Sequence, residues 1–185
     1  MSPTWLDELA WPEERVGDAV ASLAAAAGLG PRPADLPRLV PPEDGRTAWL
    51  DDTVERVASW LEIDAEPVSA KLSDLDLLLR RAAPALVRLG DEERPRLLAL
   101  LRTTPRRAVF LAPSGRLVDR ALGDLRAELV PARARAGAAD VDAMLERAGL
   151  PASKRARVRD LFVRERFAPL PVSGVWLLRR LPSAP

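Results

Sequence analysis

Residues 85–118 read ALVRLGDEERPRLLALLRTTPRRAVFLAPSGRLV, and they carry the strongest indication of the fold class. Short apolar runs alternate in it with groups rich in Gly, Pro, Thr and acidic residues. Apolar runs of this length between turn residues are typical of β-strands joined by tight turns. The stretch therefore predicts an antiparallel meander of four strands. The four runs are Ala85–Leu89, Arg96–Arg102, Arg107–Leu111 and Arg116–Val118.

Helical periodicity appears on both sides of this meander. In Thr47–Leu61 the residues Leu50, Val54 and Val57 recur at helical spacing, which predicts a helix with one apolar face packed on the sheet. Helices, then an antiparallel sheet, then helices along the chain is the order of elements in an α+β protein. Ser73 with Asp76 predicts a capping box for a helix that runs to about Ala82. Further helices are predicted at Ser2–Leu9, Pro12–Ala27, Leu122–Leu129, Ala138–Ala148 and Pro151–Phe167, and extended pieces at Glu66–Ala70 and Val172–Leu178.

Composition divides the chain into four parts. Residues 1–30 form a helical segment, which Trp5 and Trp11 would anchor to the body. Residues 31–46 are rich in proline and are interpreted as a linker or as a strap along the surface. Residues 47–130 are the predicted core, and residues 131–185 are C-terminal helices and a strand that lead toward a membrane domain.

The amino acids that are missing limit the chemistry. The 185 residues include no histidine and no cysteine, which excludes Cys–His catalysis and zinc sites built from thiolate or imidazole. The net charge of +1 gives no overall attraction to nucleic acid. No apolar run approaches the roughly 20 residues that span a bilayer. We expect a cytoplasmic protein with no catalytic residues, no cofactor and no metal.

The segment Trp49–Leu129 resembles the papain-like peptidase domain at the N-terminus of bacterial ABC transporters that cut double-glycine leader peptides. In that family a cysteine opens a buried helix, a Gly-His-Phe sequence starts a strand, and an Asp-Pro pair follows. Here the helix begins near Trp49, Arg96 stands at the start of a strand, and Ala112-Pro113 begins sixteen residues beyond Arg96. The family's glutamine before the cysteine would fall near Glu43. Nucleophile, base and orienting carboxylate are therefore all replaced.

This resemblance implies a papain-like cysteine-peptidase-like fold with extra N- and C-terminal helices, but without catalysis. It implies a domain that binds cargo or leader peptide, or regulates, in an ABC-type peptide exporter. The partners would be the transmembrane and nucleotide-binding parts, with a possible homodimer through the transporter, at the inner face of the bacterial plasma membrane. The residues expected to touch the peptide are Trp49, Trp60, Arg96 and Ala112.

Three alternatives stay open at this level. The chain is either part of an exporter or a free-standing peptide-binding adaptor of a biosynthetic cluster. Trp49 and Trp60 either line a groove or pack in the core, and Trp176 lies either at a membrane interface or in a buried strand. In the basic segment 154–166 and the residue after it, the apolar stripe of Val158, Leu161, Phe162 and Phe167 would be buried and the arginines would form a solvated outer face, so we expect no nucleic-acid partner.

Overall fold

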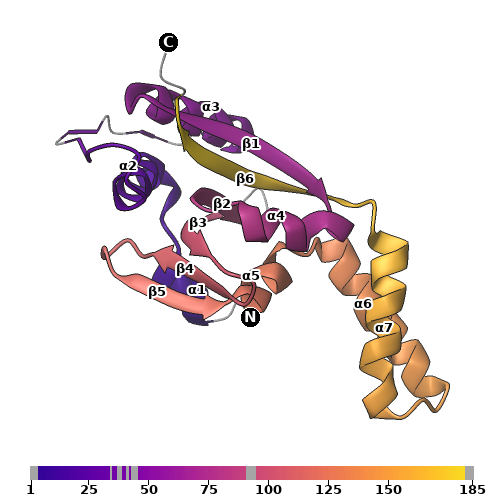
Figure 1. Cartoon of the computed structure of the whole chain (residues 1–185). Helices are drawn as coiled ribbons and strands as arrows, with labels where there is room; N and C mark the ends of the chain where they lie inside the picture. The colour runs from indigo at the N-terminus through magenta and orange to yellow at the C-terminus, as the bar shows by residue number, and fades with distance from the viewer. Residues whose placement is uncertain are drawn as a thin grey trace.

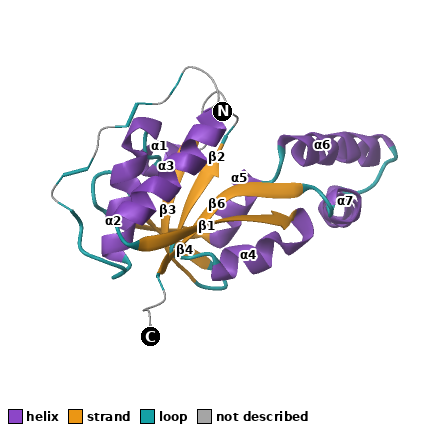
Figure 2. Cartoon of the chain, turned by 90° about the horizontal axis from the view of Figure 1, so that it is seen from above, coloured by secondary structure: helices purple, strands orange, loops and turns teal. Residues whose placement is uncertain are grey.

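An antiparallel sheet of six strands, in the order β1-β6-β2-β3-β4-β5, runs through the molecule (Figure 1). The computed structural model describes residues 4–33, 35–36, 39–40, 42, 46–90 and 95–181. Helices cover both faces of the sheet (Figure 2), and the α+β class predicted from the sequence is confirmed. The strands are β1 Ile63–Lys71, β2 Ala85–Leu89, β3 Arg96–Thr103, β4 Arg107–Leu111, β5 Leu117–Ala121 and β6 Pro171–Arg180.

The predicted meander is confirmed as β2 to β5, in which each strand pairs with the next along the chain. Leu86 lies opposite Ala99, and Ala99 lies opposite Leu111, so apolar residues face one another across three strands. A register shift between Leu100 and Arg102 marks a bulge in β3. The last strand extends three residues beyond its predicted end at Val118.

Strand β6 lies between β1 and β2 and completes the centre of the sheet. Its Val175 is the register partner of both Val68 in β1 and Val87 in β2. The sheet therefore extends beyond residues 47–130, because a strand from the C-terminal part pairs with both β1 and β2. Trp176 is buried, which confirms the second of the two interpretations of this residue.

Two long helices, α2 Val16–Ala26 and α3 Arg46–Trp60, cover one face of the sheet. A short 3-10 turn, Glu13–Arg15, leads into α2. Val54 of α3 is fully buried in the same apolar cluster as Leu86 of β2, so the predicted packing of this helix on the sheet is confirmed. In the proline-rich segment, Leu36 and Leu39 pack against this cluster, as expected of a strap.

Three shorter helices contribute to the cluster on the opposite face: α1 Thr4–Leu9, α4 Leu75–Arg81 and α5 Leu122–Leu129. The capping box predicted for Ser73 and Asp76 is wrong. A 3-10 turn at Leu72–Asp74 precedes α4, so the α-helix begins too late for Ser73 to cap it. The Ser73 hydroxyl instead donates to Asp74, and Asp76 forms an ion pair with Arg126.

The helices α6 Ala132–Arg147 and α7 Ala152–Phe167 form a hairpin that projects from one end of the sheet, orange and yellow in Figure 1. We call this hairpin the arm, and the rest of the molecule the body. Helix α6 begins six residues before its predicted start at Ala138. Phe167, at the base of the arm, is buried in the core of the body.

Most of the apolar stripe predicted to be buried on α7 is exposed, although its last residue, Phe167, is buried. Two ion pairs join the exposed parts of the two helices. Arg155 pairs with Glu146 at 2.9 Å, and this hydrogen bond raises the pKa of Arg155. Arg159, also on the α6 side, lies 3.9 Å from Asp142. Three apolar residues of the stripe, Val158, Leu161 and Phe162, are 40% exposed or more, and Phe162 lines a shallow hollow between the two helices with Val141 and Met144 of α6.

Candidate functional site

The residues matched to the peptidase positions lie at the ends of their elements. Arg96 is the first residue of β3, and its guanidinium forms an ion pair of 2.8 Å with Asp7 of α1. Ala112 directly follows β4 and is buried in the cluster on the α4–α5 face. Trp49, in the first turn of α3, is half-buried against the cluster on the other face. Ala112 and Trp49 are thus on opposite sides of the sheet.

Trp60 is the last residue of α3 and is 51% exposed. It lies eleven positions after Trp49, which is about 16 Å along a helix. The structure therefore does not bring Trp49, Trp60, Arg96 and Ala112 into one groove. Glu43 and the acidic turn at positions 91–93 lie outside the described residues.

The N-terminal segment covers the end of the sheet where Arg96 and Ala112 lie. The backbone N–H of Trp11 donates to the Leu97 carbonyl at 2.8 Å, and its indole N–H donates to the Leu111 carbonyl at the same distance. The end of β4 makes the first of these contacts possible. Its last residue, Leu111, lies opposite Ala99, so β4 does not extend as far as Leu97. The backbone and the indole ring of Trp11 thus occupy this end of β3.

Two more contacts hold this segment in place. Glu8 forms an ion pair with Arg116, in the turn after Ala112. The ring centroid of Trp5 is 6.1 Å from that of the buried Phe110. The predicted anchoring roles of Trp5 and Trp11 are confirmed.

A groove lies at the other end of β3, where α2 ends and leaves β4 and β5 uncovered. It has a volume of about 730 Å³ and an apolar floor of Leu101, Val109 and Leu117. Leu117 is 49% exposed. Arg80 and Arg81, from the end of α4, and Arg102 of β3 also line it. We call this hollow the β5 groove.

The β5 groove has unbalanced charge. Its described lining includes three guanidinium groups and no carboxylate. Among the ion pairs between described residues, none involves Arg80, Arg81 or Arg102. An apolar floor with unpaired guanidinium groups suits a ligand that carries both apolar side chains and carboxylates.

The outer edge of β5 adjoins this groove. The N–H of Ala112 donates to the Arg116 carbonyl, and the N–H of Leu122 donates to the Arg106 carbonyl, both at 2.9 Å. These two bonds set the alternation of the β4–β5 ladder. The backbone groups of alternate β5 residues, namely Leu117, Asp119 and Ala121, therefore point away from β4 toward the open edge.

Sequence reasoning missed the β5 groove. Its arginines come from positions 80, 81 and 102, which are adjacent only through the folding of α4 beside β3. The one usable indication was Leu117, an apolar residue in a strand at the edge of the predicted meander.

The described residues were also compared with the requirements of a metal centre and of a membrane span. No group of three or more carboxylates lies close enough to hold a metal ion in this part of the chain. None of its helices has the length and apolar character needed to cross a bilayer. Comparison with protein-family models and with curated proteins finds no match to this chain.

Proposed function

We propose that this chain is a catalytically inactive, papain-like peptidase-related domain that binds the leader or cargo peptide of an ABC-type peptide exporter. Support comes from the arrangement of α3 on a meander sheet, with Arg96 at the start of β3 and Ala112 at the end of β4. Neither residue can supply a nucleophile or a base. The contacts of Trp11 with Leu97 and Leu111 close this end of the sheet, so binding would occur elsewhere.

The observation that carries the peptide-binding proposal is the open β5 edge beside an apolar, arginine-lined groove. An extended peptide would pair with the outward backbone groups of β5 and extend the sheet by one strand. Every second side chain would then face the floor formed by Leu101, Val109 and Leu117. The guanidinium groups would bind carboxylates of the peptide.

Calorimetric titration with the precursor peptides encoded beside the gene tests this mode. Asp119→Pro removes an N–H that points to the open edge, and it leaves the bonds between β4 and β5 intact. We expect about tenfold weaker binding, as for the loss of one or two hydrogen bonds. Asp119→Ala is the matched control, because both variants lose the 2.9 Å pair between Asp119 and Arg107.

Equal affinities of the two variants would exclude pairing at the β5 edge. No peptide fragment should appear in these mixtures. Cleavage that survives repurification and is abolished by one substitution in this chain would refute the inactive-domain proposal.

The buried Trp176 favours a second candidate, a free-standing peptide-binding adaptor. Because this tryptophan packs in the sheet, it does not support a connection to a membrane interface. Both candidates use the same groove. The coding sequence beyond Pro185 separates them, since an exporter requires membrane-spanning helices and a nucleotide-binding domain.

A further inference from the structure

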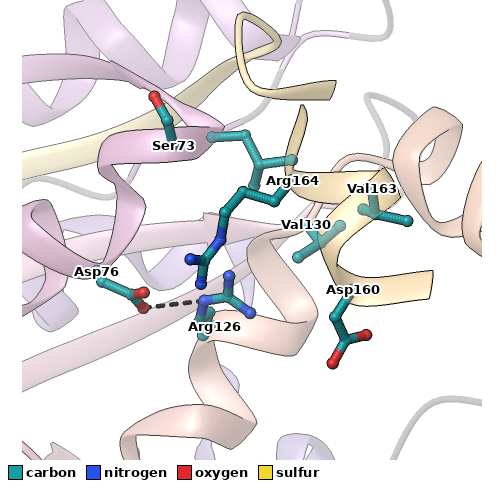
Figure 3. Close-up of a pocket in the computed structure, with 8 residues that line it drawn as sticks. Ser73, Asp76, Arg126, Val130, Asp160, Val163 and Arg164 are labelled. Carbon is teal, nitrogen blue, oxygen red and sulfur yellow. Dashed lines mark ion pairs between the residues drawn. The ribbon is translucent and has the colours of Figure 1, made fainter. Parts of the chain in front are cut away.

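A second hollow, of about 590 Å³, lies where the arm joins the body (Figure 3). Its walls come from α4 with the turn before it, from α5 and from α7. Two guanidinium groups point toward one another there, Arg126 from α5 and Arg164 from α7. Val130 and Val163 supply apolar wall beside them. The hollow thus places two cations from separate parts of the fold around one space.

One carboxylate, that of Asp76, forms an ion pair with one of these two guanidinium groups. The Nε of Arg126 is 2.9 Å from Oδ1 of Asp76, but it is not aligned for a hydrogen bond and is buried without one. Asp160 also lines the hollow, yet its carboxylate points away from both guanidinium groups and pairs with Arg159 at 3.2 Å. Among the residues that the structure describes, Arg164 has no ion-pair or hydrogen-bond partner. The facing pair therefore carries an excess of one positive charge.

We propose that this hollow binds a phosphate group between Arg126 and Arg164. Guanidinium groups that approach from two helices can each donate to different oxygens of a tetrahedral oxyanion. A planar carboxylate matches the fork of a single guanidinium, which makes it the poorer fit here. The volume exceeds that of a bare phosphate, so the site accommodates a phosphate monoester with a small organic group.

A bound phosphate would join the arm to the body. Arg126 belongs to the sheet-covering helix α5, whereas Arg164 lies in the last turn of α7. At present two backbone bonds link α7's end to the body here: the N–H groups of Leu72 and Ser73 donate to Leu170 and Ala168. The site shares no lining residue with the β5 groove, so this proposal does not depend on peptide binding.

Titration with inorganic phosphate, followed by NMR of the arginine Nε–Hε groups, tests the site. We expect the signals of Arg126 and Arg164 to move together along one saturable curve. Arg164→Gln should weaken binding about tenfold, as for the loss of a charge-assisted hydrogen bond. Arg157→Gln is the matched control, because Arg157 is an exposed arginine two turns earlier on α7 and does not line the hollow.

Equal weakening in the two variants, or no saturable shift at either arginine, would overturn the proposal. Arg164 is exposed, so its replacement leaves the core intact and the test remains valid even if an Arg126 variant fails to fold.

Two further titrations identify the source of the phosphate. Glycerol 3-phosphate represents a soluble monoester, and vesicles of phosphatidylcholine with phosphatidic acid represent a lipid headgroup. Arg164-dependent binding to either one supports the site and names its source. Binding to the vesicles alone with equal loss in Arg157→Gln and Arg164→Gln would indicate general surface charge and contradict the site.

Discussion

The body and the arm are built on different physical principles. In the body, apolar clusters on both faces of one sheet bury residues from helices far apart in the sequence. In the arm, ion pairs lie between the two helices and several large apolar side chains stay exposed, while apolar burial is concentrated at its base around Phe167. Residues 132–167 contain nine Lys or Arg and five Asp or Glu, a net charge of +4. The remainder therefore carries −3, since the whole chain carries +1.

From this difference we expect the body to be more stable than the arm. Long-range burial makes the sheet and its helices one cooperative unit, whereas contacts within a hairpin can open without disturbing the rest. We therefore expect amide hydrogen exchange to be faster in α6 and α7 than in β2, β3 and β6.

Val54→Asp should have the largest effect, because it places an unpaired carboxylate in the cluster between α3 and the sheet. We expect the free energy of unfolding to fall by more than about 4 kcal/mol, which leaves the chain unfolded. Circular dichroism during heating measures this, with the exposed neighbour Glu55→Ala as control. A Val54→Asp protein that melts like the parent would mean that α3 does not pack on the sheet.

Gly137→Ala should destabilise the arm and its junction with the body. A Cβ at Gly137 would lie 2.3 Å from Cζ of Phe167, whose ring is buried at the base of the arm. The ring or the helix must shift, at a cost of about 1–3 kcal/mol. Gly123→Ala is the control, because its Cβ would meet no atom within 4 Å in α5.

Hydrogen exchange measures the effect of these two variants. Gly137→Ala should speed exchange in α6 and α7 and leave β2 and β3 unchanged, whereas Gly123→Ala should speed it nowhere. Acceleration throughout the sheet in Gly137→Ala would show that arm and body unfold as one unit.

Glu146→Gln should have the smallest effect. It removes the negative charge paired with Arg155 between the helices of the arm but keeps an oxygen that can accept a hydrogen bond, and exposed ion pairs contribute little. We expect slightly faster exchange in α7 at low ionic strength, with the difference from the parent disappearing at high salt. A difference that is the same at both salt concentrations would mean that packing, and not charge, joins the two helices.

The sequence predicts those parts of the fold whose contacts are local. The meander from β2 to β5 could be predicted because each strand pairs with its neighbour across a turn that the residue types specify. The apolar face of α3 could be predicted from helical spacing. In both cases one segment contains all the information that the prediction needs.

The parts that could not be predicted depend on distant partners. Periodicity gives α7 an apolar stripe, but it does not say which element covers that stripe, and here Val158 and Leu161 face outward. The resemblance placed Arg96 in a groove, but it did not foresee that Asp7 and Trp11 would pack over that end of β3. The arginines of the β5 groove likewise meet only through the folding of α4 beside β3.

The place of β6 in the sheet has a consequence for synthesis on the ribosome. Strands β1 to β5 leave the exit tunnel before β6, and β2 to β5 can then form their meander, while the partner of β2 on its other side is the last strand to be made. From Gly123 to Leu170 the arm and its connections must be translated before Pro171–Arg180 emerges. During that interval the nascent chain exposes an unpaired apolar strand edge, which favours association with other chains. A slow ribosome between these two points should therefore increase the need for chaperones.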